Sequence, residues 1–367
     1  MSTANAARDL DLLRAAVGDD RLTYLGLSYG TFLGASYLNL FPDRVRAVIL
    51  DGVLDPVEWT IGSDSTGFRV PFSTRLKSDA GAFKTLGAFF SLCAQAGPAR
   101  CAFAMGPDEP GAEALQEMFA TLMQRLREHP LAMTTPVGVF YITYALVVSV
   151  VLGALYSPAI WPLLGALLQD LWMRSDATAA VAFVQHRAAL QPLPYDNGSE
   201  AGAAVFCADS DNPHNPFVWP RAARQADERS PYFGSAWTWV SIPCASWPVR
   251  DRDRYVGPWN RATSSPVLVI GNTFDPATRY EGAVALSHDL ARTRLLTLDG
   301  WGHTSFGKSS CIEQFEVKYL VAGLLPPEGT VCKPDQSPFG PITNEDLQRQ
   351  EQIAAIAEPR TNSLPGG

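Results

Sequence analysis

A serine with glycines two residues to either side, Gly26-Leu27-Ser28-Tyr29-Gly30, constrains the fold of this chain more than any other feature. The apolar, strand-like run "RLTYLGL" leads into it, and the helical pattern "YGTFLGASYLNLF" follows. In a sharp strand-to-helix turn the flanking residues must be small, because larger side chains collide where strand and helix meet. The pattern therefore predicts a turn that exposes the Ser28 hydroxyl as a nucleophile.

The order of the predicted elements indicates a parallel α/β fold. Residues 1–18 predict an amphipathic helix with Thr3 as its N-cap and Gly18 at its end. The strand-like run "RVRAVILDGVLDP" follows the serine turn, and strand and helix patterns alternate again from Ser264. These later segments are "SPVLVIGNTFDPATR", "YEGAVALSHDLA", "TRLLTLDGWGHTSF" and "CIEQFEVKYLVAGLLP".

Between about residues 60 and 255 the alternation is lost and helical patterns dominate, which predicts a helical insertion. The clearest patterns are "GAFKTLGAFFSLCAQAG", "GAEALQEMFATLMQRLREH" and "SDATAAVAFVQHRAAL", and "QPLPYDNGSEAG" is predicted as a loop. Residues 137–156 carry no charge over 20 positions. Their β-rich start, and the Ser-Pro that follows, favour a strand and then buried helices over a membrane span.

The charge pattern argues against nucleic-acid binding. The formal net charge is −8, and no run of Lys or Arg occurs in the sequence. Nucleic-acid binders carry a basic face instead. No P-loop, dinucleotide fingerprint or metal-binding helix occurs either, so we expect no cofactor and no metal.

A nucleophilic serine needs a base, and His303 is the strongest candidate. It stands in "DGWGHTSF" after a strand-like run, where Gly300 and Gly302 free the backbone to present its side chain. The other histidines lie in helical patterns or in a polar loop: His129, His186, His214 and His288.

Asp275 is the candidate for the acid that orients the base. It follows "VLVIGNTF", at the carboxyl end of a predicted strand, where α/β sites assemble. The order Ser28, Asp275, His303 is the order of the α/β-hydrolase triad. Asp51 and Asp55 follow the strand after the serine turn and remain alternative acids. In the resulting hypothesis His303 takes the Ser28 proton, Asp275 fixes the imidazole tautomer and the Tyr29 N–H is one oxyanion donor.

Six cysteines favour disulfides and an oxidising compartment. They fall in three neighbouring sets, Cys93 and Cys101, Cys207 and Cys244, Cys311 and Cys332. None has zinc-finger spacing. Six cysteines allow many pairings, so the residues alone leave the connectivity open.

Together these segments resemble the secreted bacterial tripeptidyl aminopeptidases of the proline-iminopeptidase-like branch of the α/β hydrolases. The resemblance is carried in order by "GLSYGTFLGASYLNLFPDRVRAVILDGVLDP", "LYSPAIWPLL", "FCADSDNP", "IPCASWP", "PVLVIGNTFDPATRYEGA" and "GWGHTSF". It covers nearly the whole chain. From roughly residue 206 to 339 the chain looks like the TAP-like C-terminal domain of that family.

The resemblance implies an α/β-hydrolase core with a mainly helical lid, the triad Ser28, Asp275 and His303, and disulfides between neighbouring cysteines. It also implies removal of short peptides from a substrate with a free N-terminus. An acidic group must then meet the substrate ammonium, and Asp209, Asp211 and Glu200 are the candidates. The parts implied are residues 1–59 with the serine turn, 60–205 as lid, 206–339 with acid and base, and 340–367 as a flexible tail.

The chain departs from the family pattern at its start. Family members carry a signal peptide, several strands and a Gly/Pro-rich oxyanion loop ahead of the serine strand, whereas 27 residues precede Ser28 here. The expectation is an α/β-hydrolase fold that lacks its N-terminal strands, in a secreted or cell-envelope protein whose sequence shows no signal peptide. The alternatives are an esterase acting on small acyl esters and an inactive peptide-binding remnant. The sequence leaves the oligomeric state open.

Overall fold

The structure is a computed structural model that describes residues 2–106, 110–135, 138–173 and 197–340. A parallel five-stranded sheet with the order β1-β2-β5-β6-β7 forms its centre. The strands are β1 (Leu22–Leu27), β2 (Val45–Asp51), β5 (Val267–Phe274), β6 (Thr293–Trp301) and β7 (Val331–Cys332). Because the strands are parallel, the carboxyl ends of β1, β2, β5 and β6 meet at one edge of the sheet.

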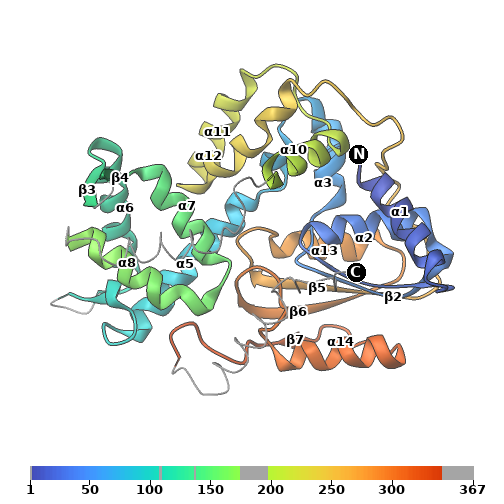
Figure 1. Ribbon diagram of the computed structural model, residues 1–367. Coiled ribbons are helices and arrows are strands. Elements are labelled where there is room, and N and C mark those ends of the chain that lie inside the picture. The colour runs from blue at the N-terminus through green and yellow to red at the C-terminus, as the bar shows by residue number, and fades with distance from the viewer. Residues whose placement is uncertain (1, 107–109, 136–137, 174–196, 341–367) are drawn as a thin grey trace, which may run out of the picture.

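Helices cover both faces of this sheet (Figure 1). The helices α2 (Tyr29–Leu40) and α13 (Tyr280–Asp289) lie on one face, with α1 (Thr3–Ala16) packed against α2. The helix α14 (Ser310–Ala322) lies on the other face. This layered arrangement confirms the predicted α/β class.

Alternating side chains of β2 build the two apolar cores. Val48 and Leu50 belong to the core shared with α2 and α13, whereas Ala47 and Ile49 belong to the core shared with α14. A strand that contributes to cores on both faces is apolar where both faces are buried, as β2 is over residues 47–50, whereas Arg46 is exposed. β1 lies at the edge of the sheet among the described strands, and Leu25 on it is 41% exposed.

The chain between β2 and β5 forms a mainly helical insertion. Its long helices share an apolar core of their own, in which Phe89 and Trp161 are fully buried. The elements are α3 (Pro56–Thr60), α4 (Phe72–Arg75), α5 (Ser78–Ala96), α6 (Ala112–Glu128), β3 (Leu131–Thr135), β4 (Gly138–Ile142), α7 (Tyr144–Leu155), α8 (Trp161–Met173), α10 (Gly198–Asp209), α11 (Val218–Arg229) and α12 (Phe233–Thr238). The insertion also contains the short 3-10 helices η2 (Ser63–Phe68), η3 (Ala102–Ala104), η4 (Pro158–Ile160) and η5 (Trp239–Ala245), and η1 (Pro42–Arg44) precedes β2.

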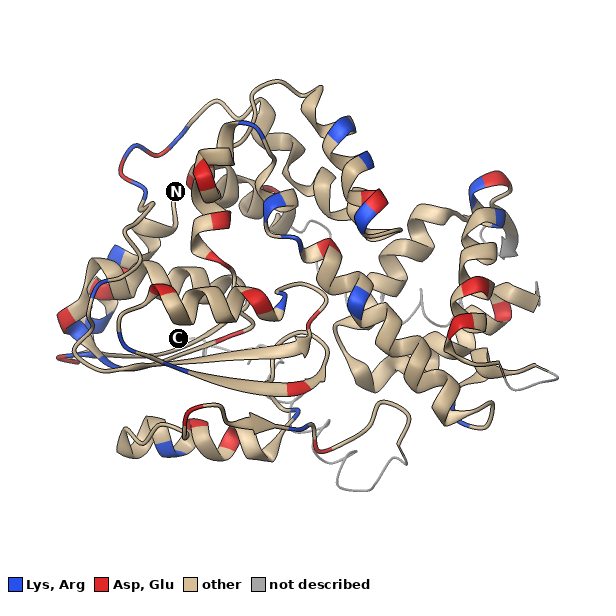
Figure 2. Ribbon diagram, turned by 180° about the vertical axis from the view of Figure 1, so that it is seen from behind, with Lys and Arg blue, Asp and Glu red and all other residues tan. Residues whose placement is uncertain are grey.

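The uncharged segment contains the strand β4 and the helix α7, and the helix α8 follows it, as predicted. In the part of the chain that the structure describes, no helix has both the length and the apolar character that crossing a bilayer requires. Acidic and basic residues are interspersed over the visible elements (Figure 2).

Two local expectations differ from the structure, and one strand was not expected. Ser2, not Thr3, is the N-cap of α1, because the Thr3 amide and hydroxyl bond to Asp209. The segment predicted as a loop already contains the start of α10 at Gly198. β3 was not predicted from sequence, since it exists through its antiparallel pairing with β4. The predicted helix "SDATAAVAFVQHRAAL", with His186, and the tail from residue 341 lie outside the described residues.

Three disulfides join the neighbouring cysteines, which confirms the pairing that the family resemblance implies. Cys93 pairs with Cys101, Cys207 with Cys244 and Cys311 with Cys332. The first links α5 to the N-cap of η3, the second α10 to η5 and the third α14 to β7. Such crosslinks are stable in oxidising compartments, which fits a secreted protein.

Candidate active site

Ser28 lies in the predicted strand–turn–helix between β1 and α2. Its backbone is strained, with φ +54° and ψ −122°, which non-glycine residues rarely adopt. The Ser28 N–H donates to the carbonyl of Asp51 on β2, over 3.0 Å. A Cβ on Gly26 would lie 2.5 Å from the carbonyl oxygen of Gly30, and one on Gly34 2.5 Å from Leu50. Close contact therefore requires glycine at Gly26, as the sequence pattern predicts, and at Gly34, whereas a Cβ on Gly30 would meet only the Tyr24 hydroxyl, at 3.2 Å.

Tyr29 begins α2, so its N–H is one of the first-turn amides that have no acceptor within the helix. Helix N-termini carry partial positive charge, and this one begins next to the Ser28 hydroxyl. The turn can therefore stabilise negative charge that develops on an atom attached to Ser28.

His303 and Asp275 lie at the ends of neighbouring strands and form a hydrogen-bonded pair. The His303 Nδ1 lies 3.0 Å from each oxygen of Asp275. The Asp275 side chain is fully buried, whereas that of His303 is 13% exposed. Burial by itself would raise the pKa of Asp275, but the charge and hydrogen bond of His303 and the amides of Thr278 and Ala277 hold that pKa below its usual range. Asp275 is thus a buried carboxylate that stays ionised.

The surroundings of Gly52 show that the His303 imidazole and the serine turn lie near each other. It follows Asp51, whose carbonyl holds the Ser28 amide, and has φ +69°. A Cβ on Gly52 would lie 3.4 Å from the Cε1 of His303. The imidazole therefore lies over the end of β2, beside β1, whose last residue precedes Ser28.

The two alternative acids have other partners. Asp51 accepts hydrogen bonds from the amide and hydroxyl of Ser305. Asp55 caps α3 by accepting from the amides of Val57 and Glu58. Of the three acids, Asp275 alone has a described hydrogen bond to His303.

The other described histidines lie apart from this pair. His129 is the C-cap of α6, His288 lies in the last turn of α13, and His214 lies in a loop beside Phe68. All three are exposed.

The three acids predicted to meet a substrate ammonium differ in their surroundings. Asp209 is buried and accepts from the amide and hydroxyl of Thr3, whose hydroxyl also lies 2.5 Å from the Tyr29 hydroxyl. Burial raises the pKa of Asp209. Asp211 forms ion pairs with two arginines, Arg254 at 2.5 Å and Arg250 at 3.3 Å. Glu200 is exposed in the first turn of α10. Their role stays a prediction.

Two residues near His303 were not identified from the sequence. The Thr278 hydroxyl donates to Asp275 over 2.9 Å and lies 3.3 Å from the Nδ1 of His303. The Tyr156 ring packs edge-on against the His303 ring, with ring centroids 5.0 Å apart. The backbone carbonyl of Tyr156 accepts a hydrogen bond from the backbone N–H of His303. Both lie in quoted segments, "DPAT" and "LYSP", but only the fold shows that these meet at one histidine.

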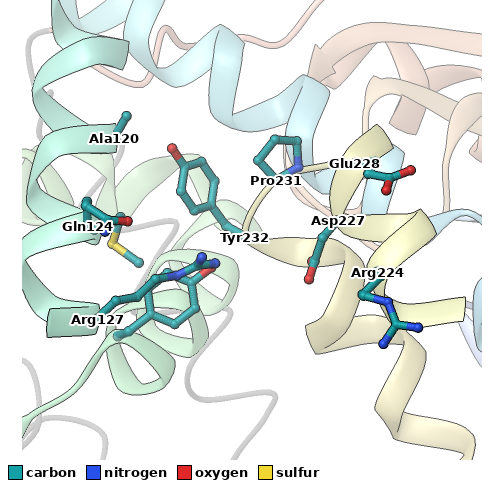
Figure 3. A pocket seen from close by; sticks show the side chains of 10 residues that line it. Ala120, Gln124, Arg127, Arg224, Asp227, Glu228, Pro231 and Tyr232 are labelled. Carbon is teal, nitrogen blue, oxygen red and sulfur yellow. The ribbon is translucent and has the colours of Figure 1, made fainter. Parts of the chain in front are cut away.

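A pocket of about 460 Å³ lies elsewhere, between α6 and the α11–α12 segment. Arg127 of α6 and Arg224 and Asp227 of α11 line it, with Tyr232 between them (Figure 3). Since none of its lining residues is Ser28, Asp275 or His303, the candidate site does not depend on this pocket.

Glu316 of α14 makes the stability of the protein depend on pH. Burial and the negative charges of Asp51 and Glu313 raise the pKa of Glu316 from its ordinary value of 4.5 to about 7. Between these values the native state binds more protons than the unfolded chain, so this group lowers the free energy of unfolding as pH rises from about 4 to 8. We expect Glu316→Gln to be more stable than the unmodified protein at pH 8 by roughly 1–2 kcal/mol, and equally stable near pH 4.

Urea unfolding at both pH values measures this difference. The matched control is Glu328→Gln, which neutralises an exposed glutamate. A stability gain that is the same at both pH values, or that also occurs in the control, would contradict the role given to Glu316.

The sequence matches two family models. Residues 1–128 match the model described as alpha/beta hydrolase fold, and residues 230–332 match the one described as TAP-like protein. The first match contains Ser28 and the second contains Asp275 and His303.

Several curated proteins are similar over most of the chain. It is 34% identical over 353 residues to "Serine protease Hip1" of Mycobacterium tuberculosis, covering 90% of this chain and 62% of that protein. It is 31% identical over 348 residues to "Tripeptidyl aminopeptidase" of Streptomyces lividans, covering 92% and 59%. It is 32% identical over 343 residues to "Carboxylesterase B" of Mycobacterium tuberculosis, covering 91% and 61%. The chain spans about three fifths of the length of these relatives.

Proposed function

Because this chain is an α/β hydrolase with a TAP-like C-terminal part, we propose that it is a serine hydrolase of the aminopeptidase type. It would release short peptides from the free N-terminus of a peptide substrate. One observation supports this most directly: the buried Asp275–His303 pair lies over the end of β2, beside the strained turn that presents Ser28.

In the proposed mechanism the Nε2 of His303 takes the proton of the Ser28 hydroxyl, and Ser28 attacks the substrate carbonyl. The Nδ1 of His303 keeps its proton toward Asp275, whose carboxylate stabilises the imidazolium that forms. His303 then donates a proton to the leaving amine, and a water molecule releases the acyl group from Ser28.

The Tyr29 amide is proposed as one donor to the oxyanion. Its place at the start of α2 adds the helix dipole to the hydrogen bond. Loss of a single oxyanion donor typically costs about 10²–10³ in rate. The position of this amide is therefore an important part of the proposal.

An esterase acting on small acyl esters is the second candidate function. The similarity to the protein named "Carboxylesterase B" favours it, and the same Ser28, Asp275 and His303 would act. The two functions differ in whether the site recognises a free substrate amine.

A substrate panel separates the two functions. Tripeptide anilides with a free N-terminus, the same anilides with an acetylated N-terminus, and nitrophenyl esters are compared by kcat/KM. The aminopeptidase function predicts that acetylation lowers kcat/KM at least about tenfold, because it removes the substrate ammonium charge and a hydrogen bond to a charged group contributes about 1.5–3 kcal/mol. Turnover confined to the esters would contradict the aminopeptidase function and support the esterase function.

The three disulfides support a further part of the proposal, an extracellular or cell-envelope location. Thiol titration of the denatured protein, isolated from its native cells without reductant, should find no free cysteine. Six reactive thiols would contradict this location.

A further inference from the structure

The loop that carries His303 has positive φ on both sides of the histidine. Gly302 has φ +87° and Thr304 has φ +60°. Glycine adopts positive φ at little cost, but threonine does not, so Thr304 stays in this conformation only because its surroundings enforce it. The surroundings of this loop therefore decide where the imidazole lies.

Three polar side chains hold the loop without touching the imidazole. The Asn272 amide donates to the carbonyls of Gly302 and Thr304. The Lys308 ammonium donates to the carbonyls of His303 and Thr304. The Asp51 carboxylate accepts from Ser305, over 2.8 and 3.0 Å from the amide and 2.9 Å from the hydroxyl.

Asp51 also holds the serine turn. Its carbonyl accepts the Ser28 N–H, while its carboxylate holds Ser305, two residues after His303. One residue at the end of β2 thus connects the two loops that carry the nucleophile and the base. A shift of Asp51 would move both loops.

Lys308 is the cation of this buried group. Burial lowers the pKa of Lys308 to about 8, although the negative charges of Asp275 and Asp51 favour its charged form. Burial raises the pKa of Asp51 to about 6, which the bonds from Ser305 and the charge of Lys308 oppose. The other charged groups that bear on this cluster are Asp275 of the loop after β5 and Glu316 of α14.

We propose that Asp51 and Lys308 are positioning residues that hold the His303 loop on the serine turn and, with opposite charges, set the electrostatic field at the imidazole. This inference rests on the proposed function, since it concerns the base of that reaction. Neither residue has a described bond to the imidazole, so both act through the backbone and through their charge.

The two charges have opposite effects on the protonated imidazole. A nearby cation disfavours it and a nearby anion favours it, and burial weakens the screening of both by solvent. Lys308→Met removes the cation and Asp51→Asn removes the anion, each with little change in size. A purely structural role would weaken the protein without moving the His303 titration in opposite directions.

The test follows the protonation of His303 by NMR of histidine-labelled protein, with the His303 signals assigned through His303→Gln. We expect the titration midpoint to rise in Lys308→Met and to fall in Asp51→Asn, each by about half a pH unit to one pH unit. The control is Lys318→Met, which removes an exposed charge on α14 and should move the midpoint by less than about 0.2 units. The acidic limb of the kcat/KM profile should move in parallel.

Midpoints that stay unchanged, or that move in the same direction in both variants while circular dichroism shows a native fold, would overturn the proposal. If Lys308→Met does not fold, Lys308→Arg replaces it: an unchanged midpoint there, with a fall in Asp51→Asn, supports the proposal. If Asp51→Asn does not fold, Lys308→Met alone is the test: a higher His303 midpoint supports the proposal, and an unchanged midpoint overturns it.

Two further outcomes separate this proposal from the proposed function. An unmodified protein without turnover whose midpoints still move as expected would contradict the proposed function alone. An active protein with unmoved midpoints would contradict this inference alone.

Discussion

Ser28→Ala should lower kcat/KM by about 10⁴–10⁶ on any substrate that the protein turns over. The alanine keeps the small size that the turn between β1 and α2 requires, so the protein should fold normally. It lacks the oxygen that would attack the carbonyl, and no oxyanion donor or base can replace that oxygen. The residual rate should come from water acting in the same site.

A fluorophosphonate probe measures the same property without a known substrate, because it reacts with activated serines. Intact mass spectrometry should show one adduct on the unmodified protein and none on Ser28→Ala. Ser149→Ala, which removes an exposed hydroxyl on α7, should be labelled like the unmodified protein. Labelling that survives in Ser28→Ala would exclude Ser28 as the nucleophile. No labelling of the unmodified protein would favour the inactive, peptide-binding alternative.

Asp275→Asn is the second change with a large expected effect, a loss of about 10⁴ in kcat. The shape of the side chain is kept, but the amide can donate a hydrogen bond to the Nδ1 of His303. This favours the wrong imidazole tautomer, in which Nε2 carries the proton and cannot accept one from Ser28. KM should change little, because the Asp275 side chain is fully buried.

Asp55→Asn is the matched control for this prediction. Asp55 also follows β2 and was an alternative acid in the sequence, but it caps α3. Asparagine is an equally good N-cap, so kcat should stay within about threefold of the unmodified value. Should Asp55→Asn lose activity as Asp275→Asn does, the assignment of the acid to Asp275 would be wrong.

Local patterns made the parts of the fold around Ser28 predictable. The contacts of Gly26 and Gly34 are steric requirements of one short turn, so they leave a signature within a few residues. The same holds for the strands: residues 47–50 of β2 and 267–270 of β5 are buried and form continuous apolar runs in the sequence. The hairpin of β3 and β4 was only half predicted, because β3 depends on its partner rather than on its own pattern.

The candidate site could be predicted only in outline. Asp275 and His303 each follow a recognisable strand, and their order in the chain favoured them. Thr278 and Tyr156 carry no such signal, because a hydroxyl or a ring becomes relevant only through the residue that it meets. A residue that the sequence suggests as a binding group can also have another partner in the fold. Asp211 is a reasonable candidate in the sequence for binding the substrate amine, but in the fold it pairs with Arg254 and Arg250.

The sequence by itself determined the serine turn, the parallel strand–helix order and the candidate acid and base, since each depends on residues close together in the chain. The family resemblance added the pairing of neighbouring cysteines. Only the tertiary structure decided which acid meets His303. Asp51 ends a strand of the sheet and Asp55 and Asp275 follow strands of the same sheet, so the direction and partners of their side chains decide which acid meets His303. The structure also decided that Asp51 joins the loops of Ser28 and His303, because a contact across 254 residues leaves no local pattern.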